Sequence, residues 1–191
     1  EVPEPQPEAN QVLVRVKASG LNRADLIMAS GRKHGSRGGA GAIAGLEWAG
    51  EVVEVGTVVD GIKAGDRVMC SGGGGYAEYA VSDWGRTALI PANNMSFEQA
   101  ATLPVALQTM HNAVVTAGRL LEGEAVIIQG ASSGVGLMGM QIAKHLGARL
   151  VIGTSTNAER RARLGEFGAD LALDSSDPEW PDAALEATDG Q

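Results

Sequence analysis

The feature that most restricts the fold is a glycine-rich turn between a short apolar run and a helix-forming stretch. The turn reads Gly-Ala-Ser-Ser-Gly-Val-Gly over residues 130–136. Apolar runs and helix-forming stretches alternate around it: the predicted strands are 125–129, 149–153 and 170–173, and the predicted helices run from the turn to about 146 and over 158–167. This alternation predicts a parallel sheet covered by helices.

A tight glycine turn in this position can hold the pyrophosphate of a dinucleotide, because backbone N–H groups and the positive helix end point toward it. A shifted G-x-G-x-x-G match begins at Gly134, but its last glycine, Gly139, falls inside the helix. The alternative is that the glycines only permit close packing of strand and helix. Because strand, turn, helix and second strand are all present, we predict dinucleotide binding by Gly130, Ala131, Ser132, Ser133, Gly134, Val135 and Gly136.

The end of the second predicted strand favours NADP(H). NAD sites place a carboxylate about 20 residues after the turn, whereas NADP sites use arginine and small polar groups. Here the strand ends Gly-Thr-Ser-Thr-Asn over 153–157, and two arginines follow. The alternative is a solvated helix face in which Glu159 pairs with these arginines. We predict that Thr154, Ser155, Asn157 and Arg160 bind the cofactor, with Arg160 reaching the 2′-phosphate.

The N-terminal half has a different pattern, with many short strands separated by glycine and polar residues. Residues 11–18 alternate apolar and polar, which predicts a half-buried strand. A short helix is predicted at 22–29, a glycine-rich basic loop at 31–45, and a hairpin turn at 72–75; further strands are predicted at 49–55, 66–69, 76–81 and 88–90. This half therefore predicts a small β-barrel or sandwich. The change of pattern comes with a stretch at 96–102 that opens with a Ser96 N-cap, followed by a separate predicted helix at 104–117 with Pro104 in its first turn.

Composition excludes several function classes. The chain has 191 residues, a net charge of −8 and a single cysteine, which excludes a disulfide framework and a cysteine-rich zinc module and disfavours nucleic acid as a partner. No apolar run approaches the ~20 residues of a membrane span. Together these properties predict a cytoplasmic protein without a nucleic-acid or membrane partner. The lone Cys70 is interpreted as a small buried hydrophobic residue.

Several motifs in order resemble the medium-chain dehydrogenase/reductase superfamily, specifically its zinc-free quinone oxidoreductase branch that includes zeta-crystallin. They are VKASGLNRADL (16–26), GLEWAGEVVEVG (45–56), AGDRVM (64–69), GGYAEYAV (74–81), SFEQAATLP (96–104) and GASSGVG (130–136). The resemblance implies an α/β fold in which a GroES-like β-barrel domain, residues 1–102, precedes the first half of a Rossmann-type parallel sheet, residues 103–191.

Zinc-dependent members of this superfamily bind the metal through Cys, His and Cys, with Glu after the His. The corresponding positions here are Asn22, Leu46 and Val105, with Glu47 retained. Leucine and valine cannot bind zinc, and asparagine is a poor ligand for it. We therefore predict no metal. Without a Lewis acid, a quinone or an α,β-unsaturated carbonyl is the better hydride acceptor, because conjugation spreads the incoming charge.

The resemblance also implies catalytic roles for three residues. Asn22 is expected near the nicotinamide or substrate, Asp25 is expected to orient Asn22, and Thr109 is expected near the nicotinamide amide. Their alternatives are a turn or helix cap for Asn22, a first-turn charge for Asp25 and an ordinary helix position for Thr109.

The acidic stretch from residue 166 is predicted to contain a third helix, and the second β-α-β-α-β half of the fold is expected outside the sequence. The chain is therefore interpreted as part of a longer protein that forms a homodimer. Three functions remain open: an NADPH-dependent quinone reductase, an enoyl or alkenal reductase, and a nucleotide-binding protein without useful catalysis.

Overall fold

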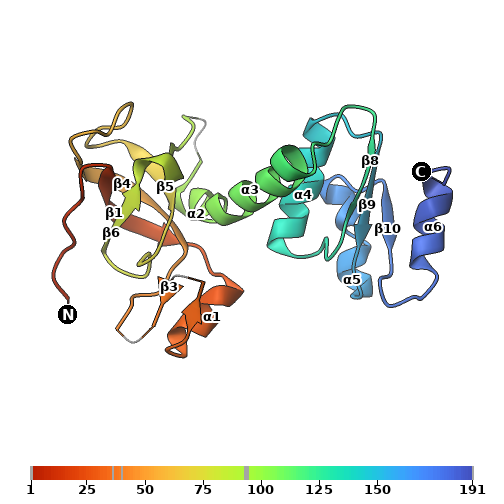
Figure 1. Ribbon diagram of the computed structural model, residues 1–191, viewed down its shortest axis with the longest axis horizontal. Coiled ribbons are helices and arrows are strands. Elements are labelled where there is room, and N and C mark those ends of the chain that lie inside the picture. The colour runs from red at the N-terminus through yellow and green to blue at the C-terminus, as the bar shows by residue number, and fades with distance from the viewer. Residues whose placement is uncertain (1, 36, 40, 93–94, 191) are drawn as a thin grey trace. The chain divides into compact units, whose positions relative to one another are not determined.

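A computed structural model describes residues 2–35, 37–39, 41–92 and 95–190 of the chain (Figure 1). The chain forms two compact units, residues 1–105 and 106–191, whose boundary lies three residues after the one predicted. No helix among the described residues is long and apolar enough to cross a membrane. Each unit is described by itself below.

The first unit is built on a five-stranded antiparallel sheet with the order β6-β1-β4-β5-β7. Its strands are β1 (Gln11–Ser19), β4 (Glu47–Val55), β5 (Arg67–Ser71), β6 (Tyr79–Asp83) and β7 (Thr87–Leu89). The register of β1 against β4 shifts twice, and such irregularities bend a strand. The sheet is curled into a half-barrel, as the resemblance implied, and its two edge strands, β6 and β7, do not pair with each other in the described part of the chain.

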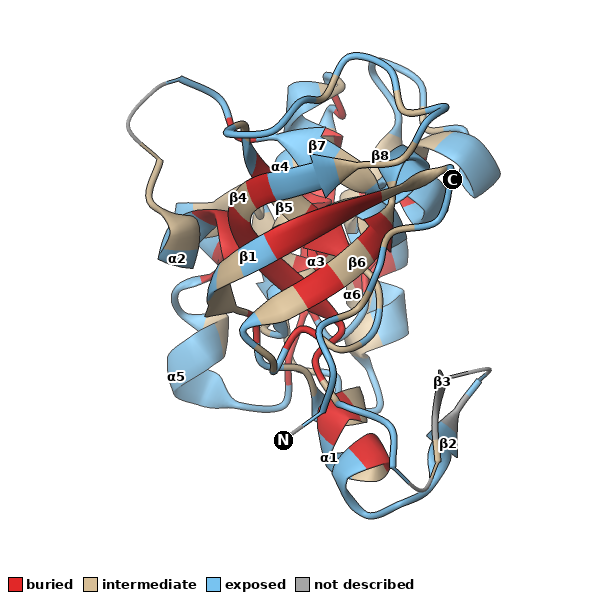
Figure 2. Cartoon of the chain, turned by 90° about the vertical axis from the view of Figure 1, so that its left-hand side faces the viewer, coloured by how far each residue is buried: buried red, intermediate tan, exposed pale blue. Residues whose placement is uncertain are grey.

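One face of this sheet carries the larger of the two buried clusters of the first unit. Figure 2 shows the buried stretches along β1, β4 and β6. The alternation predicted for the first strand is confirmed only in part, since three consecutive residues at its start are buried. The cluster contains Val12, Val14, Trp48, Val52, Val68, Cys70 and Ala80.

Short elements complete the first unit. They are α1 (Arg23–Ala29), β2 (Lys33–His34), β3 (Arg37–Gly38), the 3₁₀ turn η1 (Trp84–Arg86) and α2 (Phe97–Ala101). The predicted N-cap is confirmed, because Ser96 Oγ accepts a hydrogen bond from Gln99 N at 3.2 Å. The predicted loop 31–45 contains the short β2–β3 ladder, and its positions 36 and 40 lie outside the described residues.

The predicted hairpin at residues 72–75 is wrong. The strands on either side, β5 and β6, do not pair with each other, since β5 lies between β4 and β7 whereas β6 pairs with β1. The strand predicted at 76–81 also begins later, at Tyr79. The glycines serve packing instead: a Cβ at Gly72 would lie 2.5 Å from the Trp48 ring, and one at Gly75 would lie 2.8 Å from it. Close packing on a buried indole thus explains part of this glycine run.

The second unit is, as predicted, a parallel three-stranded sheet covered by helices, and the helices lie on both of its faces (Figure 1). Its strands, in the order β10-β9-β8, are β8 (Ala125–Ile128), β9 (Leu150–Thr154) and β10 (Leu171–Leu173). Its helices include α4 (Gly134–His145), α5 (Ala158–Arg161), the 3₁₀ turn η3 (Leu164–Phe167) and α6 (Trp180–Ala187), the helix predicted in the acidic stretch. The core contains Met140, Val151 and Leu164.

Two predicted helices are less regular than expected. The helix predicted at 104–117 is α-helical only over α3 (Pro104–His111), and it continues as the π-helix η2 (Asn112–Ala117), in which Gly118 N–H donates to Ala113 O at 2.8 Å. The helix predicted at 158–167 is divided into α5 and η3, because Arg163 N–H donates three residues back to Arg160 O. The predicted stops at Gly147 and Gly168 are confirmed by positive φ angles of 81° and 99°.

Cys70 lies on β5 with no exposed surface. Its Sγ lies 3.7 Å from Thr87 Oγ1, and burial raises the pKa of the thiol to about 12. A thiol this far from ionisation is a poor nucleophile at neutral pH, so the interpretation of Cys70 as a packing residue agrees with the structure.

Candidate functional site

The glycine turn of the second unit is closed by its own side chains and backbone. Ser133 is the N-cap of α4, and its Oγ accepts a hydrogen bond from Gly136 N at 3.1 Å. Gly130 has a φ of +62°, which side-chain-bearing residues adopt rarely. A Cβ at Gly136 would lie 2.6 Å from Ala131 Cα. The packing alternative therefore holds for Gly136, which lets the helix approach the strand.

The opposite side of the turn is open. A Cβ at Gly134 would have no atom within 4 Å. In the part of the chain that the structure describes, the N–H groups of Gly134 and Val135, at the start of α4, have no hydrogen-bond acceptor. Free N–H groups at the positive end of a helix form a suitable site for an anion.

The turn is attached to the end of β9. Ala131 N–H donates to Thr154 O at 2.8 Å, and Gly130 N–H donates to Thr154 Oγ1 at 3.3 Å. The hydroxyl groups of Ser132 and Ser155 lie 2.9 Å apart. Thr154 and Ser155 are buried, and through these contacts both help to hold the turn. The structure thus brings the predicted cofactor residues of the turn and of the strand end to one edge of the sheet.

The arginines after β9 differ in how they are bound. Arg161 donates to Ser155 O at 2.8 Å and pairs with Asp174 at 3.0 Å. Hydrogen bonds from Ser176 and the nearby Arg161 guanidinium lower the pKa of Asp174. Arg161 therefore stabilises the turn between strand and helix rather than facing a ligand.

Arg160 is the arginine left open. It is exposed, and its guanidinium has no partner among the described residues. The alternative of a Glu159 pair with the arginines is not observed in the described part of the chain, where Arg163 pairs with Glu166 at 2.9 Å. Asn157, predicted to bind cofactor, is the N-cap of α5, and its Oδ1 accepts a hydrogen bond from Arg160 N at 2.9 Å.

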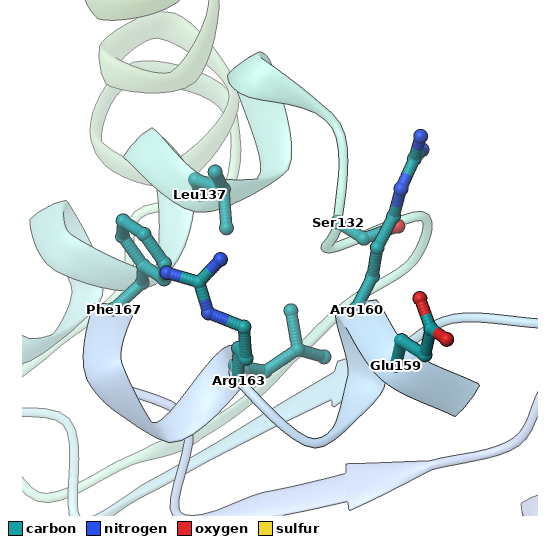
Figure 3. Close-up of a pocket in the computed structure, with 7 residues that line it drawn as sticks. Ser132, Leu137, Glu159, Arg160, Arg163 and Phe167 are labelled. Carbon is teal, nitrogen blue, oxygen red and sulfur yellow. The ribbon is translucent and has the colours of Figure 1, made fainter. Parts of the chain in front are cut away.

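A pocket of about 320 Å³ lies beside these residues (Figure 3). Its lining combines cationic, acidic, hydroxyl and apolar side chains from the glycine turn, α4 and the segment from α5 to η3, namely Ser132, Leu137, Glu159, Arg160, Arg163, Leu164 and Phe167. Apolar walls with a few polar groups suit a flat ring carrying a charged substituent. Leu137, Arg163 and Phe167 were missed from the sequence, although Arg163 and Phe167 lie one and two turns after Arg160.

The polar residues predicted as catalytic in the first unit form a hydrogen-bonded network. Asp25 is 5% exposed. Its Oδ1 accepts from Gly45 N at 3.1 Å, and its Oδ2 accepts from Asn22 N and from the Tyr76 hydroxyl, both at 2.8 Å. Partial burial, with the Asp25 carboxylate beside it, raises the pKa of Tyr76 to about 12. Asp25 therefore fixes local geometry, and both of its oxygens are occupied.

A second buried carboxylate, Glu47, adjoins this network. Its Oε1 accepts from Asn22 Nδ2 at 2.9 Å, and its Oε2 accepts from Val105 N at 2.8 Å. Asn22 is half-buried and is the N-cap of α1. The alternative that Asn22 caps a helix therefore agrees with the structure. Its side-chain amide donates to Glu47.

Two further predictions concern Thr109 and the metal. Thr109 is exposed on α3 and belongs to the second unit, and its catalytic role stays a prediction. Leu46 and Val105 occupy two of the positions where the resemblance places zinc ligands. Their side chains carry no atom that can bind zinc. Within the described residues, no group of three or more His, Cys, Asp or Glu side chains could hold a metal ion.

Two family profiles match the chain: the alcohol dehydrogenase GroES-like domain over residues 8–92, and the zinc-binding dehydrogenase domain over residues 134–191. The chain belongs to the medium-chain dehydrogenase/reductase superfamily. As the motifs predicted, it groups with the zinc-free quinone oxidoreductase branch.

Curated relatives fall into more than one class. The chain is 36% identical, over its whole length, to 8% of a phenolphthiocerol/phthiocerol polyketide synthase of Mycobacterium tuberculosis. It is 35% identical, over 86% of its length, to half of a quinone oxidoreductase of Rattus norvegicus. It is 33% identical, over 93% of its length, to 48% of a 2-methylene-furan-3-one reductase of Solanum lycopersicum. The chain thus spans half or less of each of these relatives.

Solved structures agree on the fold. An alcohol dehydrogenase superfamily protein of Novosphingobium aromaticivorans matches the whole chain with a TM-score of 0.89 and 35% identity, and the chain covers 58% of it. Escherichia coli quinone oxidoreductase, complexed with NADPH, matches the whole chain with a TM-score of 0.82 and 31% identity, again over 58% of that protein. Both units of the chain therefore have the fold of this superfamily.

Proposed function

We propose that this protein is an NADPH-dependent oxidoreductase that transfers hydride to a quinone without a zinc ion. The observation that carries the proposal is the edge of the second sheet, where an open glycine turn lies beside a strand end without acidic residues and an unpaired Arg160. These residues fit a phosphorylated dinucleotide.

The donor set supports this fit. The unbonded N–H groups of Gly134 and Val135 would bind the pyrophosphate. Arg160 would donate to the 2′-phosphate, because its planar fork matches phosphate oxygens and it forms no ion pair among the described residues. Ser132 and the apolar pocket walls would bind the adenosine.

The residues at the zinc-ligand positions support a conjugated acceptor. With leucine and valine at two of the three positions, the chain offers no metal to polarise a simple carbonyl. A quinone accepts the hydride that the nicotinamide supplies when bound, and a proton from water completes the hydroquinone. The chain's own contribution is to hold the two reactants and to fix polar groups such as the Asn22 amide.

The test compares NADPH and NADH oxidation by the intact gene product, with a small quinone and with a conjugated enal, each with and without a chelator. NADPH oxidation that the chelator leaves unchanged is expected, with the quinone as the faster acceptor. A chelator-sensitive rate would contradict the absence of zinc, and no oxidation with either acceptor would leave only nucleotide binding.

Arg160→Ala tests the cofactor assignment. Its KM for NADPH is expected to rise about tenfold to hundredfold, as for the loss of one charged hydrogen-bond donor, with the KM for NADH nearly unchanged. The matched control is Arg149→Ala, an exposed arginine outside the pocket. Equal effects of Arg160→Ala on both cofactors would overturn recognition of the 2′-phosphate.

A second candidate function is reduction of an α,β-unsaturated carbonyl. The tomato relative, named a 2-methylene-furan-3-one reductase, favours it, and such an acceptor needs a metal no more than a quinone does. A faster rate with the enal in the same assay would select this candidate.

A further inference from the structure

The Glu47 carboxylate connects two segments of the first unit that are far apart in the sequence. Its two oxygens bind different donors, the Asn22 side-chain amide at 2.9 Å and the Val105 backbone N–H at 2.8 Å. Glu47 is 5% exposed, and its own backbone oxygen accepts from Gly20 N at 3.1 Å. A buried carboxylate with both oxygens occupied has a fixed orientation.

Close packing prevents Glu47 from adopting another position. A Cβ at Gly20 would lie 2.6 Å from both Cγ and Oε1 of Glu47, so the chain before Asn22 runs directly against the carboxylate. The backbone of Asn22 is held independently by Asp25 Oδ2. Asn22 is therefore fixed twice, through its main chain by Asp25 and through its side chain by Glu47.

The hydrogen bond to Glu47 also sets the orientation of the Asn22 amide. An ionised carboxylate has acceptors and no donor, so only the NH₂ end of the amide can face it. The amide oxygen is consequently turned away from Glu47. A glutamine at position 47 that still accepts from Val105 N–H would present its NH₂ group to Asn22 and would favour the opposite orientation of the Asn22 amide.

We propose that Glu47 is a positioning residue for the reaction: it fixes the orientation of the Asn22 amide that the bound cofactor or substrate meets. This inference rests on the proposed function and on the position near the nicotinamide or substrate that the resemblance implies for Asn22. It assigns to the retained glutamate a role that requires no metal ion.

The experiment is a double-mutant cycle that exchanges the polarity of this hydrogen bond in the intact protein. Glu47→Gln keeps the shape of the side chain. When the oxygen of the new glutamine accepts from Val105 N–H, however, its NH₂ group faces the NH₂ group of Asn22. Asn22→Asp places two carboxylates in contact. The double variant Asn22→Asp/Glu47→Gln restores a donor and an acceptor, since the new amide can donate to the new carboxylate and still accept from Val105.

The readouts are kcat, the KM for each substrate, and the melting temperature. Each single variant is expected to lose kcat/KM by about tenfold to hundredfold, as for a misplaced active-site group. The double variant is expected to recover to within about threefold of the parent. A change in the KM for NADPH would assign the Asn22 contact to the cofactor, and a change in kcat or in the acceptor's KM would assign it to the substrate.

Two results would overturn the proposal. One is lower melting temperatures with parent-like kcat/KM, which a purely structural role predicts; the other is a double variant no better than the worse single variant. If the parent protein oxidises NADPH with neither the quinone nor the enal, the proposed function is wrong, independently of the role of Glu47. The double-mutant cycle is then evaluated from the NADPH dissociation constants of the four proteins. In that case, equal NADPH dissociation constants for the parent, the two single variants and the double variant would also overturn the role of Glu47.

Discussion

The two units use their polar side chains in opposite ways. In the first unit, Asp25 and Glu47 are buried, and all four of their carboxylate oxygens accept hydrogen bonds from the chain itself. In the second unit, the helix-end N–H groups of Gly134 and Val135 and the guanidinium of Arg160 have no acceptor among the described residues. The first set is already satisfied, and the second is open.

This difference separates polar groups that fix the geometry of the protein from polar groups that can bind a ligand. A buried polar group must be paired, because leaving it unpaired in a poorly solvated place costs free energy. Most donors that remain unpaired in a folded protein are therefore exposed, as Arg160 is, and available to a ligand; the buried indole N–H of Trp48, which has no hydrogen-bond partner, is an exception. The first unit should thus respond to substitution mainly through stability and geometry, and the second mainly through affinity for an anion.

The largest expected effect tests the satisfied network. Asp25→Ala removes the acceptor of three hydrogen bonds and leaves the Gly45 N–H and the Tyr76 hydroxyl without it. The free energy of unfolding, measured in urea, should fall by about 3–4 kcal/mol. Glu54→Ala, at an exposed position of β4, should change it by no more than about 0.5 kcal/mol. Equal effects of the two variants would break the comparison.

The next effect divides two glycines of the second unit. Gly136→Ala places a Cβ 2.6 Å from the Ala131 backbone and should lower the free energy of unfolding by about 2–3 kcal/mol. Gly134→Ala meets nothing within 4 Å and should be neutral or stabilising by about 0.5–1 kcal/mol. Its NADPH affinity should nevertheless fall, because the methyl group would occupy the open side of the turn. Unchanged NADPH binding would show that this side is not used.

A smaller effect is expected for Tyr76→Phe, which loses one hydrogen bond to Asp25 and should lower the free energy of unfolding by about 1 kcal/mol. The raised pKa, about 12 against an ordinary value of 10, means that the folded state favours the neutral phenol. Its contribution is complete below pH 10 and is lost as the pH rises toward 12. Urea unfolding at pH 8 and pH 11.5 should show the variant and the parent converging at the higher pH.

The smallest effect concerns the exposed ion pair of the second unit. Arg163→Ala removes the contact with Glu166, in which both side chains are more than half exposed. The free energy of unfolding should stay unchanged within the error of the urea measurement, because water screens an exposed ion pair. Arg161→Ala, which also loses the bond to Ser155 O, should destabilise more. If Arg163→Ala has the greater effect, the assignment of Arg161 to structure is wrong.

Local patterns predicted the second unit well because its order is set by neighbours in sequence. The apolar runs, the glycine turn and the stops at Gly147 and Gly168 each depend on a few consecutive residues. The division of residues 158–167 into α5 and η3 was not predictable in this way, since a shift from four-residue to three-residue hydrogen bonding leaves no periodic signal.

The first unit shows what such patterns cannot predict. Tyr76 and Asp25 are 51 residues apart and Asn22 and Glu47 are 25 apart, so nothing in either segment indicates its partner. The error at residues 72–75 has the same origin: two strands with a glycine run between them predict a hairpin, but their partners, β1 and β4, lie elsewhere in the chain. Pairing over long separations is decided by the whole sheet.

The position of the single thiol has a practical consequence. Cys70 lies in the interior of β5, between β4 and β7, and no other cysteine occurs in the sequence. An alkylating reagent can reach it only when that part of the sheet opens. The mass added over time in native buffer therefore counts opening events of residues 1–105 alone, whatever residues 106–191 do. Added NADPH should slow this modification only if cofactor binding stabilises the first unit as well.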